Sequence, residues 1–282
     1  MTTSLTIMGA GGKMGTRITD QVADHPDYDV TYVEPAEEGR ERLAERGVEA
    51  TPAEEAVPGA DVVAMAVPDS VMDVVCAETV PLLDSGAMVL LLDPAAAYAG
   101  VLPEREDVTY FISHPCHPPL FNDETDPEAK GDLFGGQGLA AQNVVCALHQ
   151  GPESDYDRGE QVARDVYAPV MDAHRVTTEQ MAFLEPALVE TVMATCLYAI
   201  REGMDRVVEE TGIAEEAARD MVLGHLRTES AIVFDEVPYP LSDAALEAVE
   251  EGREALFRED WADRVFTAES VRESTRDIAG GE

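Results

Sequence analysis

Residues 111–124 read FISHPCHPPLFNDE and contain two histidines, His114 and His117, among three prolines. The charge of a histidine changes near neutral pH, so this pair could transfer protons or bind a metal ion. The prolines exclude a helix or a regular central strand. A polyproline conformation, with three residues per turn, would place both histidines on one side, whereas β geometry would place them on opposite faces. The segment predicts a rigid corner whose backbone decides whether the histidines act together.

Three chemical roles for this corner remain open beside a structural one. A divalent metal, Mg²⁺ or Zn²⁺, would take His114, His117 and a carboxylate, for which Glu185 and Glu190 are the candidates. Without a metal, His114 or Glu185 could act as general base. Cys116 could be a nucleophile in aldehyde oxidation, although free cysteines are most often small buried apolar residues. In the structural alternative, one histidine is functional and the other bonds a backbone carbonyl.

A glycine-rich segment, GAGGKMG, lies at residues 9–15 between an apolar strand and a helical pattern. Glycines let the backbone approach a pyrophosphate, which the free amides and the dipole at the helix start attract. The spacing is one residue longer than the usual GxGxxG, so the strand–loop–helix–strand context carries the prediction of a dinucleotide site. A tight turn without a nucleotide is the alternative. The expected cofactor contacts are Gly9, Ala10, Gly11, Gly12, Lys13, Met14, Gly15, Glu34, Val67 and Pro68.

Glu34 ends the second predicted strand. A carboxylate at this position accepts hydrogen bonds from the hydroxyls of an adenosine ribose and repels a 2′-phosphate. Glu37 and Glu38 add negative charge, and Arg40 is the nearby cation. The pattern favours NAD over NADP, with Lys13 as a candidate contact to the pyrophosphate.

Short apolar runs alternate with helical patterns through residue 175. Strands are expected at 5–8, 29–34, 61–68, 88–94, 108–115, 143–151 and 173–177. Such runs predict an α/β fold with a Rossmann-type doubly wound parallel sheet, covered on both faces. Ligands bind beyond the carboxyl ends of these strands. Gly9, Pro68, Asp93 and His114 follow such ends, so the histidine corner should face the nicotinamide. The Gly- and Asp-rich stretch 121–142 predicts a lid or substrate loop.

From residue 176 onward the pattern is helical. It predicts an NAD-binding Rossmann domain at 1–175, followed by an all-helical C-terminal domain at 176–282 for substrate binding and dimerisation. Thr177 and Gln180 have the spacing of a capping box, in which each side chain bonds the backbone amide of the other residue. The helical domain should therefore begin at this pair.

The first helix of that domain contains Pro186, which predicts a kink or a new helix start at Glu185. Residues 187–200 are nearly all apolar, which predicts a helix buried on most sides. An unpaired buried carboxylate is costly, so Glu190 should meet a cation, a metal or a polar crevice.

The chain contains 19 Lys and Arg against 57 Asp and Glu, a formal net charge of −38. Such a surface repels nucleic acid and anionic lipid, so we expect no nucleic-acid and no membrane partner. The acids are spread over amphipathic helices, which is typical of a folded halophilic protein in concentrated salt. The 4 cysteines form no CxxC pair. With no signal peptide and no uncharged run of membrane length, the sequence predicts a cytoplasmic protein without disulfides.

Five motifs together resemble the D-apionate oxidoisomerase family: GAGGKMG, VAMAVPD, FISHPCHPPLFNDE, DLFGG and EQMAFLEPALVET. They span nearly the whole chain. The resemblance implies a helical region like the C-terminal domain of phosphogluconate dehydrogenase. It also implies that NAD oxidises a 2-hydroxy sugar acid, after which the carboxylate migrates to the neighbouring carbon. That reaction is a ketol-acid reductoisomerase run backwards.

Within these motifs we assign roles as hypotheses. His114 or Glu185 removes the hydroxyl proton, and a protonated His117 or a divalent metal polarises the new carbonyl. Lys130 is the candidate for holding the substrate carboxylate. Contacts to a polyhydroxylated substrate are expected from Asn122, Asp123, Glu124 and Glu190. The apolar helices predict a homodimer.

Two other functions stay open. One is a simple hydroxyacid dehydrogenase that stops at the oxo acid, without isomerisation. The other is a non-catalytic NAD-binding or redox-sensing module, which would bind the cofactor without turnover. Product analysis separates the first from an oxidoisomerase, and substitution of His114 or Glu185 separates the second from any enzyme.

Overall fold

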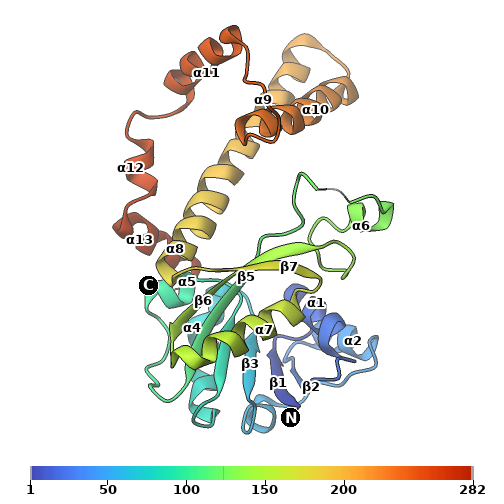
Figure 1. The fold of residues 1–282 in the computed structure, drawn as a ribbon, viewed down its shortest axis with the longest axis vertical. Coiled ribbons are helices and arrows are strands. Elements are labelled where there is room, and N and C mark those ends of the chain that lie inside the picture. The colour runs from blue at the N-terminus through green and yellow to red at the C-terminus, as the bar shows by residue number, and fades with distance from the viewer. Residues whose placement is uncertain (1, 123, 281–282) are drawn as a thin grey trace. The chain divides into compact units, whose positions relative to one another are not determined.

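The computed structural model describes residues 2–122 and 124–280. Asp123, one of the predicted substrate contacts, lies outside the described residues. Seven strands form one sheet in the order β2-β1-β3-β4-β5-β6-β7 (Figure 1). Each predicted strand is present. Their bounds are β1 (Thr3–Met8), β2 (Tyr28–Val33), β3 (Val62–Met65), β4 (Met88–Leu91), β5 (Thr109–Pro115), β6 (Gln142–Gln150) and β7 (Val170–Arg175).

The strand order reverses between β1 and β3. The chain passes from β1 through α1 (Lys13–Val22) to β2, then crosses to the other side of β1 to form β3, β4 and β5, all parallel. Successive residues of a strand point to opposite faces of the sheet. Ile7 accordingly packs in one apolar cluster and Met8 in the other. Both faces are covered, which confirms the doubly wound Rossmann-type fold and places its switch point beside β1.

The helices of this part of the chain are short. They are α1, α2 (Glu37–Ala44), α3 (Ala53–Ala56), α4 (Met72–Thr79), α5 (Ala95–Ala99), α6 (Pro127–Gly131) and α7 (Tyr156–Val166), with 3₁₀ turns η1 (Asp69–Val71), η2 (Val80–Leu82) and η3 (Glu153–Asp155). On α1, Ile18 and Val22 are fully buried. They lie on the apolar face that the sequence pattern predicts, so α1 is fixed against the sheet with its first turn at the glycine loop.

One strand departs from the predicted parallel sheet. β6 runs antiparallel to β5, with Ile112 opposite Ala147. The connection between these strands contains only the five-residue helix α6, and it does not cross the sheet. Antiparallel neighbours need no crossover helix, whereas parallel neighbours do. β7 is again parallel to β6, because α7 supplies a crossover.

The second half of the chain is helical, as predicted. α8 (Thr178–Ala182), the π-helix η4 (Phe183–Ala194) and α9 (Thr195–Thr211) follow one another directly, and α10 (Glu215–Val233), α11 (Asp243–Leu256), α12 (Trp261–Val265) and α13 (Ala268–Ile278) come after them. The capping box is confirmed. The Gln180 amide donates to Thr177 Oγ1 at 3.1 Å, and the Thr177 amide donates to Gln180 Oε1 at 2.9 Å.

Pro186 does not start a new helix at Glu185, so the alternative of a new helix start is wrong, while the alternative of a kink stays a prediction. The proline lies inside the π-helical segment η4, where the wider turn avoids the clash between a proline ring and the carbonyl four residues earlier. The Thr191 hydroxyl donates to the Pro186 carbonyl at 2.8 Å, five residues back. The helix therefore continues through Pro186, and residues 178–211 are helical without interruption.

The apolar run at 187–200 is not buried within the chain, contrary to prediction. Leu197 is 46% exposed and Tyr198 is 72% exposed, and Glu190 is exposed as well. The continuous helix Thr178–Thr211 has 34 residues and could cross a membrane by length and composition, and only 11% of its most apolar window is buried. A helix that a second subunit covers has the same composition, so this finding by itself is weak evidence for a span.

The chain divides into two compact units. Of the described residues, the first unit contains 2–119, 124–185 and 272–280, and the second contains 120–122 and 186–271. The boundary thus lies ten residues beyond the expected 175/176. Residues 272–280 belong to the first unit, where Ala279 is buried in one of the two apolar clusters of the sheet.

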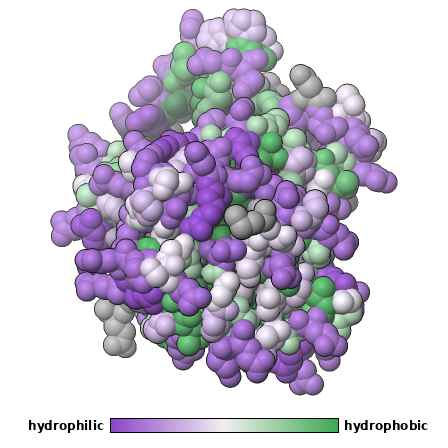
Figure 2. Space-filling view, turned by 60° about the horizontal axis from the view of Figure 1, so that its bottom comes forward, coloured by the Kyte–Doolittle hydropathy of each residue, from purple (hydrophilic) through white to green (hydrophobic). Residues whose placement is uncertain are grey.

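The acidic residues lie mainly at the surface. On the face drawn in Figure 2, hydrophilic side chains predominate. Several arginines form ion pairs at the protein surface, such as Arg46 with Asp20 and Arg206 with Glu210. With 57 acidic against 19 basic side chains, most carboxylates have no basic side chain to pair with, so solvent and salt must screen them.

Candidate active site

The segment after β1 leaves no room for a side chain at Gly9, Gly11 or Gly15, and a Cβ on Gly11 would lie 2.3 Å from the carbonyl oxygen of Gly39. Gly9 has a left-handed backbone with φ of 71°, and a Cβ there would lie 2.6 Å from the carbonyl oxygen of Ala66. A Cβ on Gly15 would lie 2.1 Å from the carbonyl oxygen of Gly9. Gly12 gives α1 no side-chain cap, and the first turn of α1 contains no acid. The first amides of α1 therefore fit an anion such as a pyrophosphate.

Glu34 lies against this loop. Its Oε2 accepts the Gly11 amide at 2.9 Å, and its Oε1 accepts the Ala36 amide at 2.9 Å. A Cβ on Gly39 would lie 2.4 Å from Glu34 Cδ, and Arg42 Nε donates to the Gly11 carbonyl at 2.6 Å. The carboxylate is held beside the glycines, so it suits the adenosine ribose of NAD.

Sequence reasoning missed the two residues on α2 that hold this arrangement, Gly39 and Arg42. The available signal was a glycine in the first turn of a predicted helix, where it lowers helix stability and needs a packing reason. The reason here is the close approach of Glu34. No sequence pattern distinguished Arg42, because an arginine on an exposed helix is most often a solvated cation.

The other predicted cofactor residues lie at the same edge of the sheet. Ala10 precedes α1, and Lys13 and Met14 form its first turn. Val67 and Pro68 follow β3, and Val67 Cγ1 would lie 3.0 Å from a Cβ on Gly9. The ammonium group of Lys13 lies 4.7 Å from the centroid of the Phe134 ring. Lys13 therefore contacts the loop between β5 and β6.

His114 ends β5, next to the end of β4. Its Nδ1 lies 2.9 Å from the carbonyl oxygen of Leu92. A carbonyl only accepts hydrogen bonds, so Nδ1 bears the proton and Nε2 of the neutral ring is unprotonated. Burial lowers the pKa of His114, an effect that the Leu92 carbonyl and the charge of Asp93 oppose. Neutral His114 is therefore a base, with its lone pair on Nε2.

His117, just after β5, also bonds a backbone carbonyl, in the loop between β5 and β6. Its Nδ1 lies 3.2 Å from the carbonyl oxygen of Phe134, which again leaves Nε2 as the unprotonated nitrogen. Its φ is 60°, which is neither the polyproline nor the β geometry considered above. A non-glycine residue in this region costs about 1–3 kcal/mol and persists where its surroundings hold it.

The structure brings the two histidines together. Their ring centroids lie 6.3 Å apart, with the planes at 82°. Both rings use Nδ1 to bind a backbone carbonyl, so both have Nε2 available. Each histidine thus bonds a backbone carbonyl, which the structural alternative expected of only one of them. Each can still act as an acid or a base through its other ring nitrogen.

Cys116, between the histidines, is a poor nucleophile. Desolvation by neighbouring protein atoms raises the pKa of its thiol. A thiolate is the reactive form of cysteine, and a raised pKa lowers the fraction of thiolate at neutral pH. The thiohemiacetal route through Cys116 is therefore disfavoured.

The predicted metal ligands do not assemble into a site. Among residues 2–122 and 124–280, no group of three His, Cys, Asp or Glu side chains could hold a metal ion. His114 and His117 alone supply two imidazoles, whereas zinc sites use three or four protein ligands and Mg²⁺ prefers oxygen. Within the described residues, the two imidazoles of His114 and His117 do not by themselves make up such a ligand set.

The remaining predicted site residues divide between the two units. Glu185, in the first unit, is half-buried. Lys130, also in the first unit, is exposed in the last turn of α6. Asn122 and Glu190 are exposed and belong to the second unit. Their roles toward a substrate stay predictions.

Comparison with known proteins gives the family. The D-apionate oxidoisomerase of Cupriavidus necator is 48% identical to this chain over 279 residues, which cover 99% of this chain and 100% of that protein. The chain belongs to the D-apionate oxidoisomerase family. In addition, the family of the phosphogluconate dehydrogenase (decarboxylating) C-terminal domain matches residues 122–279, and the coenzyme F420-dependent NADP oxidoreductase family matches residues 4–96.

Solved structures share the fold of this chain. The crystal structure of a semialdehyde dehydrogenase NAD-binding protein from Cupriavidus necator, in complex with calcium and NAD, is 48% identical with a TM-score of 0.94, over 99% of this chain and 100% of that one. An NADH-preferring ketol-acid reductoisomerase from an uncultured archean is 17% identical with a TM-score of 0.64, over 98% of this chain and 82% of that one. The second likeness shows the fold alone.

These comparisons confirm the resemblance drawn from the five motifs. They also confirm the predicted class of protein, an NAD(P)-dependent oxidoreductase with a Rossmann-type domain. The glycine loop and Glu34 fit that class without adjustment, because both lie at the switch point where such folds bind dinucleotides.

Proposed function

We propose that this protein oxidises the 2-hydroxyl group of D-apionate, or of a closely similar sugar acid, with NAD, and then isomerises the oxo acid. In a balanced isomerisation a carbon substituent, and not the carboxylate, shifts from the neighbouring carbinol carbon to the new carbonyl carbon, while the hydroxyl of the carbinol carbon loses its proton and becomes a carbonyl. The observation that carries the proposal is the bond from His114 Nδ1 to the Leu92 carbonyl at 2.9 Å. It leaves an unprotonated Nε2 at the sheet edge where the cofactor loop lies. The oxidoisomerase of Cupriavidus necator, 48% identical, supports the choice of substrate.

NAD is the proposed cofactor. The glycine loop and the first amides of α1 would hold its pyrophosphate, and Glu34 would hold the adenosine ribose. Glu34 also repels the 2′-phosphate of NADP, so the preference is for NAD. When bound, NAD accepts the hydride from the carbon that carries the substrate hydroxyl.

His114 is the proposed base for this oxidation. Its Nε2 takes the hydroxyl proton, and the Leu92 carbonyl continues to accept the Nδ1 proton of the imidazolium that forms. Glu185 is the alternative base. The Leu92 carbonyl also orients the imidazole ring of His114, as a carboxylate partner does for other catalytic histidines.

His117 is the proposed polarising residue for the isomerisation. Protonation of its Nε2 would make it a hydrogen-bond donor to the new carbonyl oxygen while the carbon substituent moves. Lys130 is proposed to bind the substrate carboxylate, and Asn122 and Glu190 are proposed to contact substrate hydroxyls. A bound divalent cation is the alternative polarising group, although the described side chains supply too few ligands for one.

We also propose that the protein is a cytoplasmic homodimer that works in concentrated salt. The exposed apolar residues of the helix Thr178–Thr211 support the dimer, because a monomer rarely leaves such a surface uncovered. The net charge of −38 supports the saline environment.

The test is the absorbance of NADH formed from NAD and D-apionate in high KCl with magnesium, with a chelator in a parallel sample. Turnover with an isomerised product supports the oxidoisomerase, and turnover that stops at the 2-oxo acid supports a simple dehydrogenase. Loss of turnover on chelation would favour the cation over His117 as the polarising group. NADH binding without turnover on any sugar acid would favour the non-catalytic module.

A further inference from the structure

The loop between β5 and β6, predicted as a lid, is anchored at one buried residue. Asp132 is 3% exposed. Its carboxylate accepts the amides of Gly136 at 3.0 Å, Gln137 at 3.0 Å, Leu139 at 3.3 Å and Ala140 at 3.5 Å. A carboxylate that binds four amides of one turn holds that turn in a single conformation. The segment 132–140 is therefore a fixed platform in this structure.

The platform presents one aromatic ring, that of Phe134, to the cofactor helix. The Lys13 ammonium lies 4.7 Å and the Arg17 guanidinium 4.8 Å from the ring centroid. Both cations come from α1, the helix that begins at the glycine loop. A Cβ on Gly136 would lie 2.6 Å from Arg17 Nε, so this glycine leaves the room that Arg17 occupies.

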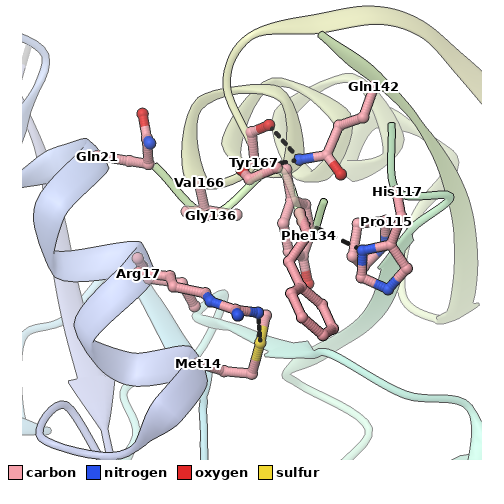
Figure 3. A pocket seen from close by; sticks show the side chains of 12 residues that line it. Met14, Arg17, Gln21, Pro115, His117, Phe134, Gly136, Gln142, Val166 and Tyr167 are labelled. Carbon is pink, nitrogen blue, oxygen red and sulfur yellow. Dashed lines mark hydrogen bonds between the residues drawn. The ribbon is translucent and has the colours of Figure 1, made fainter. Parts of the chain in front are cut away.

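The same residue also contacts the catalytic corner. The rings of Phe134 and His117 meet edge to face, with centroids 5.8 Å apart, and the Phe134 carbonyl accepts the His117 Nδ1 proton at 3.2 Å. Figure 3 shows Phe134 between Arg17 and His117, with the dashed bond from the histidine ring to the Phe134 backbone. The cavity beside these residues has a volume of only about 10 Å³, room for roughly one water molecule. A substrate therefore does not fit into this cavity, whereas Phe134 itself is 51% exposed.

We propose that Phe134 is a positioning residue for His117: its carbonyl sets the tautomer of His117, and its ring, held by Lys13 and Arg17, ties that histidine to the helix that binds the cofactor. The left-handed backbone of His117, with φ of 60°, needs such an external hold. The functional consequence rests on the proposed role of His117 in isomerisation. The tautomer itself does not depend on that role.

The test compares Phe134→Leu with Phe134→Tyr. Leucine keeps the apolar volume and removes the ring faces that the cations contact, whereas tyrosine keeps the ring. Leu133→Ala is the matched control, because Leu133 is the neighbouring residue and is 74% exposed. Each variant is examined as the full chain, by long-range ¹H–¹⁵N spectra of its histidine rings near pH 8, with His117→Gln to assign the His117 signals.

In the unsubstituted protein and in Phe134→Tyr, we expect one His117 tautomer, with Nδ1 protonated. In Phe134→Leu, we expect a mixture of tautomers and a fall of about tenfold in kcat, with NADH affinity kept within about threefold. Nε2 protonation in the unsubstituted protein would overturn the role of the Phe134 carbonyl, and a single Nδ1-protonated tautomer in Phe134→Leu would overturn the role of its ring.

The histidine spectra and kcat test this inference separately from the proposed function. If no sugar acid is oxidised by any form, the spectra without substrate still decide whether Phe134 sets the tautomer. If turnover is normal and the spectra of Phe134→Leu are unchanged, the proposed function stands and the positioning role fails. Equal losses of kcat in Leu133→Ala and Phe134→Leu would assign the effect to the loop as a whole and contradict the specific role of Phe134.

Discussion

Nδ1 of His114 and the carbonyl oxygen of Leu92 lie 2.9 Å apart, across the ends of the adjacent strands β5 and β4. The bond decides which ring nitrogen can act as a base. It is made by backbone that the sheet holds in place, so it does not depend on a flexible partner. A catalytic histidine held by a carbonyl keeps its orientation when it gains a proton, since the imidazolium still donates through Nδ1.

Replacement of His114 by asparagine tests the base. An asparagine amide can still donate toward the Leu92 carbonyl but cannot take up a proton, so we expect kcat to fall about 100- to 10,000-fold. NADH affinity, measured by fluorescence titration, should stay unchanged. His225→Asn is the control, because His225 is exposed on α10 and its Nδ1 also bonds a carbonyl, that of Met221 at 2.8 Å. Equal activity of the two variants would transfer the role of base to Glu185.

The pH dependence of kcat/KM tests the environment of His114. Burial lowers its pKa from the ordinary value of 6.5, so the neutral, basic form persists to lower pH than in a free histidine. We expect kcat/KM to be constant at pH values above about 6.5 and to fall only when the pH drops through the lowered pKa of His114. The protein should also lose stability on acidification in this range, because its native state binds fewer protons than its unfolded state. A decline that begins above pH 7 or so would contradict the assignment.

Gly39→Ala tests the packing that holds Glu34. The added Cβ would lie 2.4 Å from Glu34 Cδ, which displaces the carboxylate from the ribose position. We expect NADH affinity to fall by about tenfold or more, a loss of at least ~1.4 kcal/mol of binding free energy. Thermal stability should change less, since alanine favours a helix over glycine by about 1 kcal/mol.

The matched control for that variant is Gly224→Ala. Gly224 is also inside a helix, α10, but a Cβ there meets nothing within 4 Å. It should gain stability and keep NADH affinity. If Gly39→Ala and Gly224→Ala bind NADH equally well, Glu34 does not need the space at Gly39.

Salt should stabilise the protein strongly. With a net charge of −38, the folded state suffers self-repulsion that salt screens, because the Debye length falls from about 10 Å at 0.1 M to about 3 Å at 1 M. We expect the midpoint of thermal unfolding to rise steadily as KCl increases from about 0.1 to 2 M. Sucrose is the control, since it stabilises proteins without screening charge. A midpoint that is insensitive to KCl would contradict the halophilic interpretation.

Leu197→Glu tests the proposed dimer. Leu197 is 46% exposed on α9, and a charge there should disrupt an apolar interface and give a monomer by light scattering. Thr211→Glu adds the same charge at the end of α9 and should leave the dimer intact. A protein that is monomeric before substitution, or that sediments with lipid vesicles, would contradict the dimer.

Local sequence patterns predicted much of this molecule correctly. The seven strands follow from short apolar runs bounded by turn residues, and the capping box at Thr177 and Gln180 follows from a spacing of three residues. The glycine loop was predicted from the short spacing of its glycines between a strand and a helix, although Gly9 itself packs on the carbonyl of Ala66, far away in the sequence. Each of these signals acts over a few residues, so the sequence contains it directly.

Other features depend on which segments meet. The antiparallel direction of β6, the contact of Gly39 with Glu34, and the bond from His117 to Phe134 each join residues that no short pattern relates. The π-helix around Pro186 was not predicted, and the exposure of the apolar run after it was predicted wrongly. A proline can end, kink or widen a helix, and an apolar face can be covered by its own chain or by another.

The sequence by itself determined the Rossmann-type fold, the family, the dinucleotide loop and the histidine corner, because these rest on residue types at short fixed spacings. Only the tertiary structure decided which nitrogen of each histidine carries its proton and what holds Glu34 beside the glycines. Those properties arise from backbone carbonyls, amides and glycines brought together by the sheet, and backbone groups are the same in every sequence until the fold places them.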